Sequence, residues 1–345
     1  MASKELASPQ IDSDRVVPVA RPAGFDDLTV LVCTHNNARL LDRALESIAG
    51  QLVPAGIAWE VLVVANRCTD GTADVVRRWG ESGRIPRLRY MTERRAGIAF
   101  ARKRGLRESR GRLVGYVDDD CVLAPDWAEQ VVRFAADHPR AGAFGGRNDL
   151  SWEVPPTPLA DLYGESLARQ DMGPVPRRLP ARQWRMPVGA GLVLRRAAVI
   201  DSGWVANGVL RSRRRGSIRG AHECGEDAEI AVRIRRAGWE IWYSPNQHLS
   251  HVISADRIGL GYLRRVHRGF GRAEPVLRAL ALAPQPHRRR EAVRWSLGLL
   301  REVLDRHSEG YVRYENERPT WLIRLSHARG CLEGAAVFTL TGRGV

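Results

Sequence analysis

The sequence lacks the features that would assign it to a membrane, fibrous or repeat class of protein. No run approaches the ~18 consecutive apolar residues that a membrane-spanning helix needs, and no internal repeat is present. Of the 345 residues, 44% are hydrophobic and 27% are charged, which excludes a disordered chain, a collagen and a coiled coil. The length predicts about two domains, or one large α/β domain with an appendage.

Cysteine is scarce, and the few cysteines show no structural pattern. There are five, far apart and without a C-x-x-C pair, so neither a disulfide framework nor a zinc site is expected. Reduced thiols indicate the cytoplasm, with the inner face of the membrane as a further location. The first residues are polar and lack the apolar core of a secretion signal, and we expect 1–24 to be poorly ordered.

Negative charge is in deficit. The chain has 54 Lys and Arg against 39 Asp and Glu, a net charge of +15. This excess predicts anionic partners such as nucleotides, phosphorylated acceptors, acidic lipids or nucleic acid. The arginines are scattered and no RNA-binding motif is present, so a non-enzymatic nucleic-acid-binding protein is the weaker alternative.

Apolar segments alternate with amphipathic ones through the first 150 residues. The expected strands are 28–34, 59–65, 87–91, 113–117 and 141–146. This alternation predicts a doubly wound parallel sheet, in which ligands bind beyond the carboxyl ends of the strands. Thr34, Asn66 and Asp118 stand at three such ends, so we expect them around one crevice. Between the second strand and its helix, Gly71 is expected to take a positive φ in a turn.

The composition changes after residue 150. Prolines cluster between 155 and 187, which indicates loops or a substrate-binding segment. Beyond them we expect a helix over 226–237, a strand over 239–244, and helices over 258–272 and 287–307.

Three adjacent carboxylates, Asp118, Asp119 and Asp120, follow the strand 113–117. Like charges repel unless a cation lies among them. Hard oxygen ligands suit Mg²⁺ or Mn²⁺, which bridge carboxylates to substrate phosphates. A solvated acidic turn is the alternative, but the position after a buried strand in a basic chain favours a metal site.

Six segments in this order resemble the family 2 glycosyltransferases, which are nucleotide-sugar enzymes of the GT-A fold. They are VLVCTHNN (30–37), EVLVVANRCTDGT (60–72), RAGIAFARKRGL (95–106), YVDDDCVLAPDW (116–127), GAGLVLRR (189–196) and GEDAEIAVRIRRAGWEIWYSP (225–245). The resemblance implies a GT-A type, mostly parallel doubly wound sheet with a helical C-terminal extension. It also implies metal-dependent, inverting transfer of a sugar from a nucleotide-diphosphate sugar, most readily UDP-linked, to an acceptor hydroxyl. A glycan, a lipid-linked acceptor and a small molecule all remain open.

The resemblance also divides the chain by role. Residues 25–150 would bind the nucleotide sugar, 151–257 would bind the acceptor and supply the catalytic base, and 258–345 would form the helical extension. A nucleotidyltransferase on a related sheet is the other enzymatic alternative. Such an enzyme usually has a glycine-rich, lysine-bearing phosphate loop after the first strand, where this chain has CTHNNARLL.

On the donor side, the resemblance assigns Thr34, Asn36 and Asn66 to the base and ribose. An asparagine amide both donates and accepts, as a uracil edge requires; alternatively, Asn66 supports the turn. Arg102 would lie near the nucleotide, since arginine matches phosphate geometry, with a solvated basic helix face as the alternative.

The same resemblance assigns to the carboxylates the binding of the metal and of the ribose. Asp120 would bind the cation that joins the two phosphates, and Asp118 would contact the ribose or a metal-bound water. Asp119 would replace Asp118 if the register shifts by one. His248 and His251 follow the last expected strand, and His251 has the better spacing for a third metal ligand, although a lone histidine is more often structural.

The acids that open the helix 226–237 are assigned to catalysis. Asp227 would be the base that takes the proton from the acceptor hydroxyl, and Glu226 its neighbour; helix capping is the alternative. Between 211 and 219, five arginines form either a mobile clamp on an anionic substrate or a solvated charge run. Trp184 and Trp204 are candidate sugar platforms or packing residues.

The expected helix over 287–305 is amphipathic. One side carries Val293, Leu297, Leu300 and Leu304, with arginines elsewhere. We expect this side to pack on the core, with homodimerisation or peripheral membrane contact as alternatives.

Overall fold

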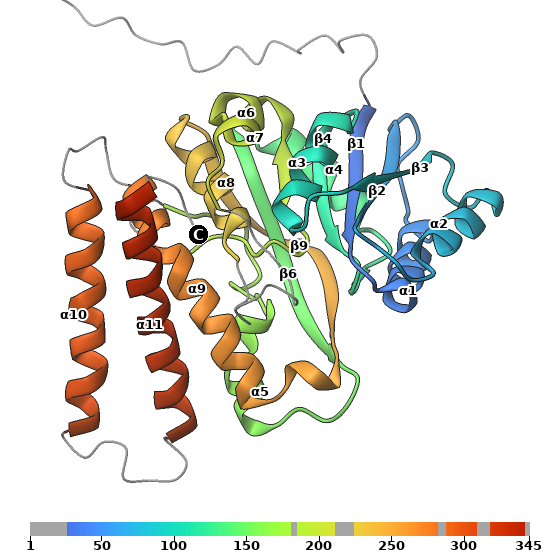
Figure 1. The fold of residues 1–345 in the computed structure, drawn as a ribbon. Coiled ribbons are helices and arrows are strands. Elements are labelled where there is room, and N and C mark those ends of the chain that lie inside the picture. Colours follow the sequence, from blue (N-terminus) through green and yellow to red (C-terminus); the bar gives the residue numbers. More distant parts are fainter. Residues whose placement is uncertain (1–25, 181–184, 211–223, 282–287, 309–317, 342–345) are drawn as a thin grey trace, which may run out of the picture.

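The computed structural model describes residues 26–180, 185–210, 224–281, 288–308 and 318–341 (Figure 1). The predicted N-terminal disorder, Trp184 and the arginines between 211 and 219 all lie outside these ranges. A single sheet of nine strands runs through the molecule, with helices on both faces. No helix among the described residues is long and apolar enough to cross a membrane.

The first part of the sheet is parallel, as predicted. Its strands follow the spatial order β3-β2-β1-β4. The elements are β1 (Asp26–Thr34), α1 (Ala38–Ala49), β2 (Trp59–Asn66), α2 (Thr72–Glu81), β3 (Leu88–Glu93), α3 (Ile98–Glu108) and β4 (Gly111–Asp118).

Alternate side chains of β1 enter two different cores, because successive residues of a strand point to opposite faces. Val30 and Val32 join the core that faces α1 and α2, while Leu31 and Cys33 join the core that faces α3. Both sets are buried, so the strand is covered on both faces and its sequence is apolar throughout.

The second part of the sheet is mixed and continues directly from β4. The order is β4-β8-β6-β9-β5, with β7 on β9. The elements are β5 (Cys121–Leu123), α4 (Trp127–Asp137), β6 (Ala141–Trp152), α5 (Pro158–Leu162), η1 (Gly164–Leu167), β7 (Arg177–Arg178), β8 (Val193–Arg195), α6 (Arg196–Ser202), α7 (Trp204–Asn207), α8 (Glu226–Arg236), β9 (Glu240–Ile253) and η2 (Ala255–Arg257).

The last strand is longer than expected, because β9 does not end at residue 244. The strand continues to Ile253, so His248 and His251 lie within it and not after it. Its register against β6 shifts at two places: Gly142 has no partner in β9, and residues 244–247 lie opposite Gly146 alone. A side chain at Gly146 would collide with the carbonyl oxygen of Gln247, only 1.6 Å from its Cβ. Beyond this bulge the two strands pair regularly again.

Three long helices form the C-terminal extension on the side of the molecule away from β1–β3 (Figure 1). They are α9 (Leu260–Ala281), α10 (Arg288–Ser308) and α11 (Arg318–Thr341). Helices α9 and α11 approach so closely that Gly271, Gly330 and Gly334 have no room for a side chain. A Cβ at each would lie 2.1–2.2 Å from a backbone oxygen of the other helix.

The apolar side predicted for α10 is not the side that is buried. Ala292, Ser296 and Val303 are buried, whereas Leu297 and Leu304 are 53% and 46% exposed. Small residues permit the closer packing, so the leucine pattern misidentified the face. The expectation of a positive φ at Gly71 was wrong, because its φ is −68°. Of the two alternatives for Trp204, the structure shows packing, because this side chain is fully buried in the core.

Candidate active site

The three consecutive aspartates at the end of β4 point to three different partners. Asp118 is paired with Arg102 at 3.1 Å, Asp119 accepts a hydrogen bond from Asn37 at 2.8 Å, and Asp120 lies 3.2 Å from His251. Each partner contributes a positive charge, a donor or a polar nitrogen, which relieves the repulsion between adjacent carboxylates. The carboxylates therefore serve separate corners of the site and do not surround one common ion.

The corner at Asp120 is built by pairing β5 with β9. Cys121 is opposite His251 in this register, which brings the carboxylate and the imidazole together. His251 Nδ1 donates to the carbonyl of Leu167 at 2.8 Å, since a carbonyl can only accept. Nε2, the atom 3.2 Å from Asp120 Oδ1, is therefore the nitrogen of a neutral imidazole that would offer its lone pair to a metal ion.

Arg257 completes this corner. Its guanidinium lies 3.0 Å from Asp120 Oδ2 and donates to His251 Nε2 at 3.3 Å. Burial would lower the pKa of Arg257, but the attraction of Asp120 outweighs it and raises the pKa. The sequence analysis missed this residue, because nothing in the local pattern distinguishes it from the many other arginines.

A carboxylate oxygen and an imidazole nitrogen with a free lone pair form a donor set that fits Mn²⁺ or Mg²⁺. Asp120 and His251 would hold such an ion, and Arg257 would have to give up its contacts with both. Asp118 is not part of this group: among the described residues, its ligand atoms and those of Asp120 and His251 do not all lie within 4.8 Å of one another.

The second corner is a buried ionic bridge. Arg102, which is 3% exposed, contacts Asp118 at 3.1 Å and Glu226 at 2.6 Å, and its guanidinium lies 4.7 Å from the Tyr116 ring. Burial alone would lower the pKa of Arg102, but the negative charges of Glu226 and Asp118 outweigh this effect and raise the pKa above its usual value. In this structure Arg102 therefore joins the end of β4 to the start of α8 and has both carboxylates as partners, whereas the sequence predicted a nucleotide contact.

Asp227 begins α8 beside Glu226 and is only partly buried. One of its oxygens, Oδ1, accepts from the backbone N–H of Ala228 at 2.8 Å. The other, Oδ2, faces Gly189: a Cβ there would lie 2.7 Å from Oδ2 and 3.1 Å from both terminal nitrogens of Arg102. Glycine at 189 thus keeps space next to the carboxylate.

The residues predicted to hold the nucleotide differ in how far their polar atoms are engaged. The Asn66 amide donates to the carbonyls of Glu93 and Arg95 and accepts from Gly97, so it fixes the loop after β3. Asn36 Oδ1 accepts from the backbone of Thr69. Among the described residues, Thr34 Oγ1 is buried with no hydrogen-bond partner, which leaves it available to a ligand.

Residues 29–202, about half of the chain, match the family model described as glycosyl transferase family 2. The chain belongs to this family. Its membership confirms the enzyme class predicted from the six motifs and removes support from both alternative classes.

Two curated relatives show how far the similarity extends. Glycosyltransferase AglE from Haloferax volcanii is 28% identical over 106 residues, 30% of this chain and 34% of the relative. The validoxylamine A glucosyltransferase of Streptomyces hygroscopicus subsp. jinggangensis is 34% identical over 107 residues, 30% of this chain and 24% of the relative. The matched part thus spans about a third of the length of one relative and about a quarter of the other.

Solved structures extend the likeness of fold over most of this chain. The mannosyltransferase PcManGT from Pyrobaculum calidifontis, in complex with GDP-Man and Mn²⁺, superposes with a TM-score of 0.56. It is 21% identical and covers 92% of this chain and 88% of its own. TarS from S. aureus gives a TM-score of 0.50 at 14% identity, covering 91% of this chain and 55% of its own. The fold is of the GT-A type, as predicted.

Proposed function

We propose that this family 2 glycosyltransferase is metal-dependent and inverting. It moves a sugar from a nucleotide-diphosphate sugar to an acceptor hydroxyl in a single displacement. The observation that carries the proposal is the position of Asp120 Oδ1 next to His251 Nε2, 3.2 Å apart beyond the end of β4. A glycan, a lipid-linked acceptor and a small molecule are all compatible with this proposal.

When bound at Asp120 and His251, Mn²⁺ or Mg²⁺ would neutralise charge on the departing diphosphate. Asp120 would be the principal ligand, because its carboxylate is held between His251 and Arg257. Thr34 Oγ1, buried without a partner at the end of β1, supports a nucleotide-binding role for the neighbouring strand ends.

Asp227 is the proposed base. As the acceptor oxygen attacks the anomeric carbon, Asp227 Oδ2 takes the hydroxyl proton, and the bond from that carbon to the diphosphate oxygen breaks. Glu226 is less suited to this role, because Arg102 lies 2.6 Å from its carboxylate and both side chains are buried. Attack from the side opposite the leaving group inverts the anomeric carbon.

The donor nucleotide is proposed to be uridine diphosphate. The neighbour that carries GDP-Man makes guanosine diphosphate the main competitor. A thermal-shift panel of UDP, GDP, dTDP and CDP, each with and without Mn²⁺, separates them. We expect the largest rise in melting temperature with UDP and Mn²⁺ together; a larger rise with GDP would overturn the uridine assignment, and no effect of Mn²⁺ would overturn the metal dependence.

Asp227→Asn tests the base. Turnover should fall by about 10²–10⁴-fold, because the amide cannot take the proton, while the dissociation constant of the nucleoside diphosphate should stay unchanged. Asp137→Asn, an exposed carboxylate on α4, is the matched control. Unchanged turnover in Asp227→Asn would remove this residue from the mechanism.

A further inference from the structure

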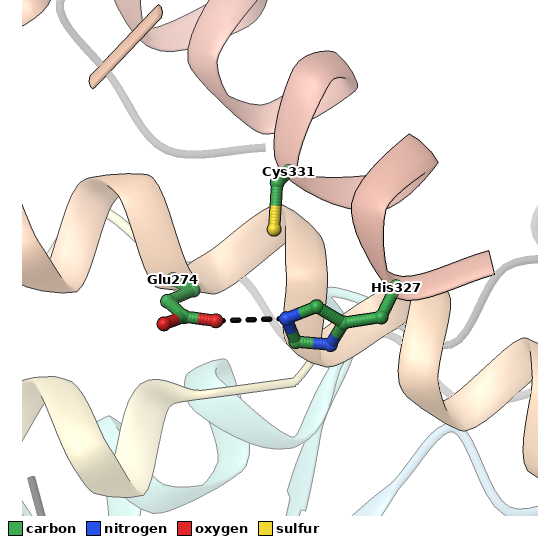
Figure 2. Close-up of side chains that lie close together, drawn as sticks. All are labelled: Glu274, His327 and Cys331. Atoms are coloured by element: carbon green, nitrogen blue, oxygen red, sulfur yellow. Dashed lines mark hydrogen bonds and ion pairs between the residues drawn. The ribbon is translucent and has the colours of Figure 1, made fainter. Parts of the chain in front are cut away.

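A second group of metal-binding side chains lies far from the carboxylates at the end of β4. Glu274 on α9 faces His327 and Cys331, which are one turn apart on α11 (Figure 2). One ligand atom from each lies within 4.8 Å of the other two, and among the described residues no other such trio of His, Cys, Asp or Glu is present.

The surrounding contacts orient these ligands. Arg278 donates twice to Glu274 Oε1, at 2.7 and 2.9 Å, which turns the other oxygen, Oε2, towards His327 Nε2 at 2.8 Å. Figure 2 shows the Cys331 sulfur directed into the space between these two groups. The backbones of α9 and α11 are fixed by the close glycine contacts, so only side-chain rotation is needed to converge on an ion.

One side of the group is open while the other is closed. Cys331 is completely buried, whereas the side chains of His327 and Glu274 are 24% and 17% exposed. An ion could therefore enter past the imidazole and the carboxylate, and water could reach it from the same side. Zinc–ligand distances of about 2.0–2.3 Å place tetrahedral ligand atoms roughly 3.3–3.7 Å apart, so the Glu274–His327 contact would open slightly.

We propose that Glu274, His327 and Cys331 bind a thiophilic divalent cation of the zinc class, with water as the fourth ligand. A thiolate, an imidazole and a carboxylate are a donor set of zinc, whereas Mg²⁺ and Mn²⁺ prefer oxygen. Binding releases the thiol proton of Cys331 to solvent, and the neutral His327 imidazole keeps its proton on Nδ1 while Nε2 binds the ion.

The proposed role of this ion is structural. Glu274 and His327 are 53 residues apart in the chain, so the ion would join α9 to α11. Next to Glu274, Ala273 packs with Leu210 and Leu277, and a Cβ at Gly225 would lie 2.7 Å from Ala273. The metal would thus stabilise the helix that supports the start of α8. The proposal does not depend on the sugar-transfer chemistry.

Cobalt is the probe that distinguishes this group from the corner at Asp120, where the proposed ligands are a carboxylate and an imidazole. The whole protein, stripped of metal by a chelator, is titrated with Co²⁺. We expect a sulfur-to-cobalt charge-transfer absorption that saturates at one equivalent and disappears when Zn²⁺ is added. It should be absent in Cys331→Ser and retained in Cys68→Ser and Asp120→Asn.

Zinc affinity and melting temperature give an independent measurement. Zn²⁺ should raise the melting temperature of the wild-type protein, and its affinity should be at least ten-fold lower in His327→Gln. If Cys331→Ser does not fold, His327→Gln and the wild-type protein decide the outcome. Absence of the charge-transfer band in the wild-type protein, or a band that persists in a folded Cys331→Ser variant, would overturn the proposal.

Discussion

The two corners at the end of β4 have an arginine between buried polar groups, yet they differ in one respect. At Asp118, Arg102 contacts two carboxylates, so one positive charge is balanced by two negative ones. At Asp120, Arg257 contacts one carboxylate and the lone pair of an imidazole. The first arrangement is an ion network that stabilises the junction of β4 with α8. The second consists of groups that a metal ion can take over from the arginine.

Removing Arg102 should have the largest effect. Arg102→Met leaves Asp118 and Glu226 without their shared cation, and we expect a loss of about 3 kcal/mol in the free energy of unfolding. Urea denaturation measures this loss. Arg94→Met, an exposed arginine just before α3, should change the stability little, and an equal loss in both variants would mean that Arg102 has no special structural role.

Gly189→Ala should impair catalysis without much loss of stability. The added methyl group would lie 2.7 Å from Asp227 Oδ2, and displacing the proposed base should reduce turnover by roughly 100-fold. Steady-state kinetics with parallel thermal melts separates the two effects. Gly259→Ala, which meets nothing within 4 Å, is the control, and full activity in Gly189→Ala would show that this space is not used.

His251→Ala tests the metal corner. Loss of the imidazole donor should weaken Mn²⁺ binding by about ten-fold or more, measured by electron paramagnetic resonance without nucleotide. His248→Ala lies on the same strand and removes a histidine that pairs with Asp149, so it should leave Mn²⁺ binding unchanged. Equal affinities in the two variants would contradict the assignment of His251.

Arg257→Met should give the smallest change, and in the opposite direction. Without the guanidinium, a cation no longer competes for Asp120 and His251, so Mn²⁺ binding should become several-fold tighter, up to about ten-fold. The same resonance titration measures it, with Arg94→Met again as control. Weaker binding in Arg257→Met would mean that the arginine supports the metal site and does not compete with it.

The sequence was most informative where strands are buried on both faces. We could locate strands β1, β2 and β4 because apolar runs end abruptly in polar residues. The aspartates that follow β4 could be located for the same reason. The neighbouring position of Asp120 and His251 could be anticipated only through the family resemblance. Their actual contact depends on the pairing of β5 with β9, and no local pattern encodes that long-range register.

Other features could not be predicted because they arise from tertiary packing. The buried side of α10 is set by small residues that fit against α11, and hydrophobicity alone indicates the leucines instead. The spacing of the cysteines gave no sign that Cys331 lies beside Glu274 and His327, because such spacing rules consider ligands close together in one segment. Glu274 and Cys331 come together only because glycines let α9 and α11 approach closely.

One small residue in β6 determines which side chain of β9 faces the active site. Gly146 lies opposite residues 244–247, so β9 has three extra residues at this bulge, and the strand resumes its pairing with a fixed parity after them. If the bulge contained one residue more or one fewer, the register after it would shift by one position. Ser250 or Val252 would then face Asp120, and the imidazole of His251 would face the opposite side of the sheet. The lack of a side chain at Gly146 thereby determines which residue of β9 lies next to Asp120.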